Sequence, residues 1–275
     1  MGESLPRLPP QWLTGHRRAT YVPTGMSGHN KWSTIKHRKG RQDAKRSRVW
    51  TRIIKEITVA ARLGGGDVDG NPRLRRAVDE AKAVNMPNDN IDRAIKKGTG
   101  ELEGVEYEEL LYEGVGPNGA LVMVEIVTDN RNRAAAEIRK IFDMHGGQLA
   151  GANAAGWAFD QKGILRLDRS AATEAKLFEV AVGAGAEDLV AEDERWVITT
   201  AREDLDTISS ALEAAEIPVS EAGLEQIPKT PKVFGGDDGE KMLQLLDALD
   251  EHDDVQNVFS DFEPDEALLA QLDAD

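Results

Sequence analysis

The hydrophobic positions of the N-terminal third recur at helical spacing. Across residues 43–63, apolar side chains repeat every three or four positions and so fall on one face of a helix. A Gly-Gly-Gly run ends this helix. Asn71 and Pro72 begin a second one, because Asn caps a helix and Pro fits its first turn. A third short helix follows Pro87, and together they predict a helical domain that we assign to residues 26–104.

From Tyr107 onward the pattern changes to alternating strands and helices. Short apolar runs bounded by turns such as Gly-Pro-Asn-Gly predict strands, and 3.6-residue periodicity predicts helices between them. Strand pairs followed by helices are typical of α+β domains of the ferredoxin-like kind. We expect two such domains. Residues 149–218 form a complete unit, which we predict to be inserted in an outer domain made of residues 105–148 and 219–262.

The two ends of the chain are expected to lie outside these domains. Residues 1–25 are rich in Pro and Arg and lack the continuous apolar stretch of a secretory signal. A disordered extension is the favoured interpretation, and a transit-like leader or a true start at Met26 are the alternatives. Residues 263–275 are interpreted as an acidic tail.

The composition narrows the functional classes. The chain of 275 residues has no cysteine, which excludes disulfides, thiol nucleophiles and Cys-based zinc sites and favours a reducing compartment. No apolar run approaches the roughly 20 residues that a membrane-spanning helix needs. We therefore expect a cytoplasmic protein that has no contact with a membrane.

The net charge of −15 argues against nucleic-acid binding, but its distribution reverses that argument. Residues 1–98 hold 21 Lys+Arg against 9 Asp+Glu, a net charge of +12. Residues 99–275 hold 13 Lys+Arg against 40 Asp+Glu, a net charge of −27. A basic end on an acidic molecule steers a polyanion to that end. A domain boundary without functional meaning is the alternative.

The strongest local signal is the basic run from Lys31 to Lys55. It carries ten cations against a single acid, Asp43. Arg48, Arg52 and Lys55 are spaced to share one face of the predicted helix, away from its apolar face. Cations at helical pitch meet phosphates while the domain keeps a core, which predicts nucleic-acid binding. A solvated face, or a contact with the acidic part of the chain, is the alternative.

Trp32 lies among the cations of the loop before this helix, where it either stacks on a base or packs in the core. The predicted nucleic-acid contacts in the basic run are Lys31, Trp32, Lys36, His37, Arg38, Lys39, Lys45, Arg46, Arg48, Arg52 and Lys55.

A second polar cluster, TDNRNR at residues 128–133, lies between a predicted strand and a predicted helix. Amides at the helix N-terminus, together with Arg131 and Arg133, make a plausible anion site, so both arginines join the predicted contacts. In the alternative interpretation, Asp129, Asn130 or Asn132 caps the helix and the arginines pair with nearby acids.

Catalytic and cofactor sites find no support in the sequence. The glycine-rich stretch at residues 64–70 follows no predicted strand and precedes no Gly-Lys-Ser/Thr, so it does not fit a phosphate loop. The acidic stretch at residues 247–254 is interpreted as solvated rather than as a metal site. No nucleophile, base and acid occur at a recognisable spacing. We predict a non-enzymatic monomer without cofactor, metal or small-molecule substrate.

Several longer motifs resemble one known family. They are MSGHNKWSTIKHRK at 26–39, DAKR at 43–46, NPRL at 71–74, PNDNIDRAIKK at 87–97, YEGVGP at 112–117, TDNRNR at 128–133 and DDVQNV at 253–258. Together they resemble the YebC/PmpR family, which is related to the mitochondrial translational activator of cytochrome c oxidase subunit I. The resemblance runs from Met26 to about Phe262. One departure is Ala154-Ala155-Gly156, where the family usually has a Gly-Ser-Val-like segment.

The resemblance implies a three-domain hook, with a helical domain and two α/β domains around a cleft. It implies a transcriptional regulator that binds DNA through the basic N-terminal domain. Other members act in translation, on ribosomes or their RNA, including at proline-rich stretches, so binding to ribosomal RNA or mRNA is the alternative. The charge segregation also fits a protein-interaction scaffold, in which the acidic part binds a basic partner and the basic domain docks on its own acidic cleft.

Overall fold

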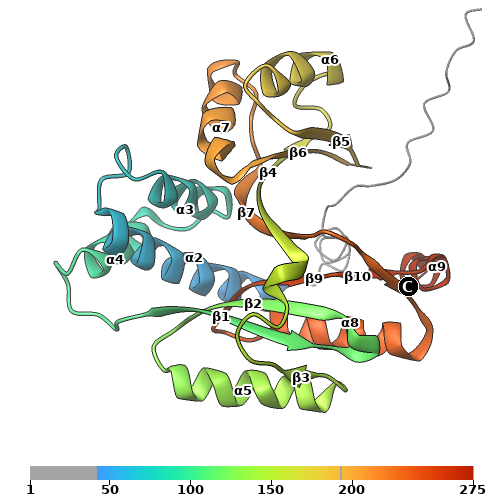
Figure 1. Cartoon of the computed structure of the whole chain (residues 1–275). Coiled ribbons are helices and arrows are strands. Elements are labelled where there is room, and N and C mark those ends of the chain that lie inside the picture. Colours follow the sequence, from blue (N-terminus) through green and yellow to red (C-terminus); the bar gives the residue numbers. More distant parts are fainter. Residues whose placement is uncertain (1–41, 193, 275) are drawn as a thin grey trace, which may run out of the picture.

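The computed structural model describes residues 42–192 and 194–274, and its first three helices form the predicted helical domain (Figure 1). These helices are α2 (Gln42–Gly64), α3 (Pro72–Ala83) and α4 (Asn88–Gly98). Asn71 caps α3 by accepting a hydrogen bond from the Leu74 amide, and Pro72 occupies the first turn. The Asn-Pro signal in the sequence therefore begins the second helix as expected.

The helical domain has a core of its own. Its buried residues are Ile53, Ile57, Ala60, Ala61, Leu74, Ala77, Val78, Ala81, Met86, Ile91 and Ala94. All of them belong to this domain, and they include the apolar face predicted for the first helix. Gly98 allows α4 to pack closely on α2, because a Cβ at this position would collide with the Thr58 carbonyl.

The outer α/β domain is built on a four-stranded antiparallel sheet with the strand order β3-β1-β2-β9. Its elements are β1 (Glu108–Val115), η1 (Pro117–Gly119), β2 (Leu121–Thr128), α5 (Arg131–Met144), β3 (Gln148–Leu149), α8 (Gly236–Asp250) and β9 (Val255–Ser260). Helices α5 and α8 lie side by side on one face of the sheet, where Val124, Phe142 and Leu246 share one core (Figure 1). Because β9 completes a sheet begun by β1 to β3, the chain between β3 and α8 contains the predicted insertion.

The inserted domain has the ferredoxin-like order of strand, helix, two strands, helix and strand. Its elements are η2 (Gly156–Ala158), β4 (Phe159–Asp168), α6 (Glu174–Leu177) with the π-helical η3 (Phe178–Val182), β5 (Asp188–Ala191), β6 (Arg195–Ala201), η4 (Arg202–Asp204), α7 (Leu205–Ala214) and β7 (Glu221–Pro228). The sheet order is β5-β6-β4-β7, and all neighbouring strands are antiparallel.

One predicted domain boundary needs correction. The sequence analysis assigned residues 219–262 to the outer domain, but β7 pairs with β4 from Pro228 opposite Phe159 to Glu221 opposite Arg166. A strand belongs to the sheet whose hydrogen bonds it completes. Residues up to the end of β7 therefore belong to the inserted domain, and the chain returns to the outer domain only after it.

The C-terminal residues are not a free acidic tail. β8 (Lys232–Phe234) pairs in parallel with β10 (Phe262–Pro264), and α9 (Glu266–Ala274) follows. Phe262 and Leu268 are 1% and 3% exposed and belong to the core of the outer domain. The tail predicted for residues 263–275 is therefore corrected over its described part, because apolar residues between the acids anchor it.

The α+β class with one domain inserted in another is confirmed. None of the three largest buried clusters contains residues of both the helical domain and another domain. Within the described part of the chain, no helix is both long and apolar enough to cross a membrane.

Candidate nucleic-acid interface

Most of the predicted nucleic-acid contacts precede the described residues or lie at their edge. Lys45 and Arg46 fall in the first turns of α2, where the structure describes the backbone but not their side chains. The contacts that lie outside the described residues are Lys31, Trp32, Lys36, His37, Arg38 and Lys39. The structure therefore places five predicted contacts in full: Arg48, Arg52, Lys55, Arg131 and Arg133.

Arg48, Arg52 and Lys55 share one face of α2, and this face lies against the turn between α8 and β9. Arg48 Nη1 is 3.3 Å from Glu251 Oε1. Arg52 Nη1 is 3.2 Å from Asp250 Oδ1, and Arg52 Nη2 donates a hydrogen bond to the Asp250 carbonyl. We call these three cations the basic stripe.

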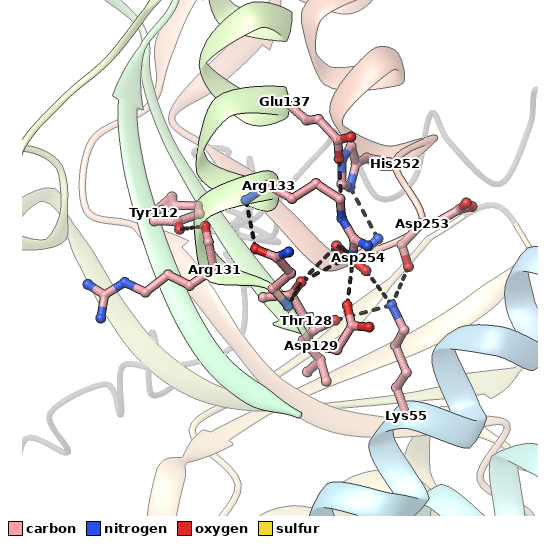
Figure 2. A network of polar contacts seen from close by, with 12 residues as sticks. Lys55, Tyr112, Thr128, Asp129, Arg131, Arg133, Glu137, His252, Asp253 and Asp254 are labelled. Atoms are coloured by element: carbon pink, nitrogen blue, oxygen red, sulfur yellow. Dashed lines mark hydrogen bonds and ion pairs between the residues drawn. The ribbon is translucent and has the colours of Figure 1, made fainter. Parts of the chain in front are cut away.

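Lys55 is the most buried member of the basic stripe. Its Nζ lies 2.6 Å from Asp254 Oδ1 and donates to the carbonyls of Val127 at 3.2 Å and Asp253 at 2.9 Å (Figure 2). An ammonium has three hydrogens, so every donor of Lys55 is used within the protein. We call residues 250–254 the acidic turn, and Lys55 ties α2 to it.

The carboxylate of Asp254 joins three elements. Besides Lys55 of α2, it accepts hydrogen bonds from Thr128 Oγ1 at the end of β2, at 2.8 Å, and from Arg133 Nη2 of α5, at 2.7 Å. Burial by itself would raise the pKa of Asp254, but the hydrogen bonds from Lys55, Arg133 and Thr128 outweigh it and hold the pKa below its ordinary value. Asp254 is therefore an ionised, nearly buried junction.

The polar cluster after β2 is mainly a helix cap. Asn130 caps α5 by accepting a hydrogen bond from the Arg133 amide at 3.1 Å, and Arg133 Nη2 also pairs with Asp129 at 2.9 Å. The guanidinium of Arg131 points away from this network (Figure 2) and forms no ion pair with a described residue. The capping interpretation therefore holds for Asn130, and Arg131 is the cation of this cluster that forms no ion pair with a described residue.

An open groove of about 880 Å³ runs beside these contacts. Its walls carry charges of both signs, and Met144, with 69% of its surface exposed, adds an apolar patch. The lining residues are Arg48, Lys55, Tyr107, Asp129, Arg133, Glu137, Lys140, Ile141, Met144, Glu251, His252, Asp253 and Asp254. In the described ranges, no group of three or more His, Cys, Asp or Glu residues is arranged to hold a metal ion.

The alternative in which the basic run contacts the acidic part of the chain holds for Arg48, Arg52 and Lys55, but the sequence analysis did not identify residues 250–254 as their partner. We interpreted this stretch as solvated, but Asp250, Glu251 and Asp254 are the partners of the basic stripe. A signal was present, because α8 has no basic residue in its last turn and ends in acids. Negative charge at a helix C-terminus is unfavourable, so cations from elsewhere in the chain were needed there.

Further ion pairs fasten the helical domain to both of the other domains. Arg73 of α3 binds Glu56 of α2 through Nε at 2.6 Å and Glu109 of β1 through Nη2 at 2.5 Å. Arg76 of α3 pairs with Asp206 of α7 in the inserted domain. Charged contacts therefore join the helical domain to both of the other domains.

A group of cations on α4 remains exposed. Arg93, Lys96 and Lys97 are spaced three and four residues apart and form no ion pair with a described residue. The sequence analysis did not count them as nucleic-acid contacts. Their spacing on one helix was the signal that would have grouped them.

The loop that departs from the resembled family is organised by Glu113 of β1. Its carboxylate accepts hydrogen bonds from the amides of Asn153 at 3.1 Å, Ala155 at 2.5 Å and Gly156 at 3.2 Å. Burial alone would raise the pKa of Glu113, but these backbone donors lower it. The substituted loop therefore has a defined conformation on the outer domain.

Comparisons with known proteins place most of the chain in one family. A family model of the TACO1/YebC N-terminal domain matches residues 30–101, and one of the TACO1/YebC second and third domain matches residues 107–262. A "Probable transcriptional regulatory protein" of Desulfosudis oleivorans is 54% identical over 235 residues, which cover 86% of this chain and 96% of that protein. A protein of the same description from Geobacter sulfurreducens is 53% identical over 238 residues, with coverage of 86% and 96%.

A solved structure agrees with this assignment. The crystal structure of a conserved hypothetical protein from Aquifex aeolicus is 42% identical and superimposes with a TM-score of 0.80, over 86% of this chain and 98% of that one. Identity at this level over nearly the full length of the relatives extends to all three domains. The chain therefore belongs to the TACO1/YebC family.

Proposed function

We propose that this chain is a nucleic-acid-binding regulator of gene expression that contacts its target through its basic N-terminal segment. Its relatives are named probable transcriptional regulatory proteins, which supports a regulatory rather than an enzymatic role. The observation that best supports nucleic-acid binding is the segregation of charge. The net charge is +12 over residues 1–98 and −27 over residues 99–275. A polyanion that approaches such a molecule is drawn to its basic end.

The ion pairs of the basic stripe move the proposed binding surface toward the start of α2. Lys55 has no donor to spare for a phosphate, and Arg48 and Arg52 are engaged with the acidic turn. Arg131 and the α4 cations are secondary positions because they are exposed. The primary proposed contacts are Lys31, Lys36, His37, Arg38, Lys39, Lys45 and Arg46, with Trp32 stacking on a base.

We propose DNA as the target, with transcription as the regulated step. Binding to ribosomal RNA or mRNA, including at proline-rich stretches, is the alternative. DNA and RNA share the phosphate backbone, and phosphate contacts fix position without carrying sequence information. Aromatic residues make up only 5% of the chain, which limits base stacking and favours backbone contacts. We further propose a cytoplasmic monomer that works without cofactor, metal or small-molecule substrate.

Crosslinking in cells, followed by sequencing of the bound DNA and RNA, tests this proposal. Enrichment of defined DNA sites supports transcription, and enrichment of ribosomal RNA or mRNA shifts the target to translation. Lys36→Glu/Arg38→Glu/Lys39→Glu should lose the crosslinks. Arg139→Glu/Lys176→Glu/Lys241→Glu, a matched change within residues 99–275 and outside the groove lining, should keep them. If the wild type and both variants crosslink to nucleic acid only at the background level, nucleic-acid binding is rejected.

A second candidate function is a protein-interaction scaffold. The observation that favours it is the docking of the basic stripe on the acidic turn, since this contact uses cations within the molecule rather than for an external target. Partners captured with the full chain should then survive nuclease treatment. Loss of all partners after nuclease treatment rejects the scaffold and leaves nucleic acid as the mediator.

A further inference from the structure

The seam between the helical domain and the outer domain is rich in charged contacts. The core cluster of the helical domain contains no residue of another domain, and the contacts that we find across the seam are ion pairs, hydrogen bonds and a cation–π contact of Lys55 with Tyr107. The connecting residues 101–106 are all exposed. Interfaces of this polar kind allow domains to move relative to one another, and salt weakens them.

The acidic turn presents the chemistry of a phosphate backbone to the basic stripe. Carboxylates of Asp250, Glu251 and Asp254 meet cations that are spaced four and three residues apart along α2. Carbonyl oxygens of the same turn accept further hydrogen bonds from Arg52 and Lys55. Because this turn ends α8, the partial negative charge of the helix C-terminus adds to its pull on cations.

The contact between the basic stripe and the acidic turn is most buried at Lys55. The side chains of Arg48, Arg52 and Lys55 are 35%, 17% and 8% exposed, so burial rises along α2 away from the basic segment. Arg52 Nε is also buried without an acceptor, so the acidic turn leaves this guanidinium incompletely satisfied. A phosphate binds arginine through two parallel hydrogen bonds and supplies the acceptors that are lacking here.

We infer that the acidic turn is an internal competitor that masks the basic stripe until a nucleic acid displaces it. This inference rests on the proposed function and extends it. A nucleic acid that is held by the segment before α2 reaches Arg48 first and Arg52 next, exchanging their carboxylates for phosphates. Lys55 stays with Asp254 and serves as the pivot. The contact is thus autoinhibitory, and its release enlarges the binding surface.

Binding of a 20-bp DNA duplex and of a 20-nucleotide RNA, followed by fluorescence anisotropy, tests the competition. Asp250→Asn/Glu251→Gln removes two competing charges and leaves every cation in place. We expect about tenfold tighter binding and a salt slope steeper by about two, because the wild type must break two internal ion pairs, which offsets the release of about 0.9 counterions at each of its two phosphate contacts. Asp237→Asn/Asp238→Asn at the opposite end of α8 removes the same charge without touching the basic stripe, and it should change the affinity less than twofold.

A distance measurement gives a readout that does not depend on affinity. The chain has no cysteine, so Ala83→Cys in α3 and Gln244→Cys in α8 accept a pair of spin labels cleanly. Adding the duplex should broaden or lengthen the distance distribution, and Asp250→Asn/Glu251→Gln should do so without it. Suppose that the wild type binds and that Asp250→Asn/Glu251→Gln changes neither the affinity nor the distance distribution. That result overturns the inference and leaves the proposed function standing. Absence of binding by every protein at low salt overturns both.

Discussion

Lys55 Nζ and Asp254 Oδ1 lie 2.6 Å apart, and this buried pair joins the helical domain to the turn that precedes β9. The two residues are 199 positions apart in the sequence. Asp254 also binds Thr128 and Arg133, so a single carboxylate connects α2, β2 and α5. The geometry around this pair decides which cations of the N-terminal domain are free to meet an external anion.

Lys55→Met should destabilise the protein by roughly 3 kcal/mol, because it leaves a buried carboxylate without its closest counter-charge. Equilibrium unfolding in urea measures this loss. Lys96→Met removes an exposed lysine that has no ion pair with a described residue, and it should change the free energy of unfolding by less than about 0.5 kcal/mol. Equal effects of the two substitutions would contradict the assigned role of Lys55.

Acid should weaken the fold through Asp254. Its pKa is lowered in the folded state, so its stabilising contribution is full above the unfolded-state pKa of about 4 and is lost as pH falls through the lower folded-state pKa. Asp254→Asn should therefore lower stability at neutral pH and flatten the loss of stability in acid. Urea unfolding between about pH 3 and pH 7 measures both, and an unchanged slope would count against the prediction.

Glu125 should show the opposite pH dependence. Burial raises its pKa above the ordinary value, the Asn257 hydrogen bond opposes this, and the charge of Glu56 adds to it. An ionised Glu125 therefore costs stability at neutral pH, and the cost is relieved as pH falls through its folded-state pKa. Glu125→Gln should raise stability at pH 7 relative to pH 4. A variant that loses stability equally at both values would refute this.

Glu113→Gln should loosen the loop at residues 153–156, because an amide offers its NH2 group where the backbone donors need an acceptor. We expect a loss of about 2 kcal/mol and faster hydrogen exchange of the Ala155 and Gly156 amides. Glu108→Gln on the exposed start of the same strand is the matched control. Protection of both amides in Glu113→Gln would show that the loop holds its conformation without the carboxylate.

Gly98→Ala should push α4 away from α2, since the new Cβ meets the Thr58 carbonyl and the Ala61 side chain. The expected cost is about 2 kcal/mol of unfolding free energy. Gly151→Ala adds a Cβ that meets nothing within 4 Å and should be nearly neutral. The difference between the two melting temperatures checks the packing directly.

Local sequence patterns predicted the helices and strands of this fold well. They did not predict which residues far apart in the sequence contact each other. Asn71 and Pro72 begin α3 because the capping interaction involves only neighbouring residues. The register of β7 with β4 depends on residues some 60 positions apart, so the boundary of the inserted domain was placed too early. Phe262 and Leu268 lie in an acidic stretch of the sequence, which was therefore interpreted as a tail. In the structure both residues pack in the core of the outer domain and hold that stretch against it.

The same limit applies to the candidate interface. Helical spacing correctly placed Arg48, Arg52 and Lys55 on one face of α2. It could not reveal that the acidic turn, about 200 residues away in the sequence, lies opposite that face. The charge pattern identifies cations, but whether a cation is free depends on the tertiary fold. The contacts proposed in the segment before α2 remain predictions.

The salt dependence of nucleic-acid affinity tests the central claim most directly. Fluorescence anisotropy should compare the wild-type chain, Lys36→Glu/Arg38→Glu/Lys39→Glu, and the control Arg139→Glu/Lys176→Glu/Lys241→Glu on one labelled 20-bp duplex and one RNA. We predict that the N-terminal variant binds at least about tenfold more weakly and that its log–log salt slope is shallower by about 2.7, while the control keeps the wild-type slope. Equal affinities and equal slopes for all three proteins at low salt would contradict binding through the basic N-terminal segment.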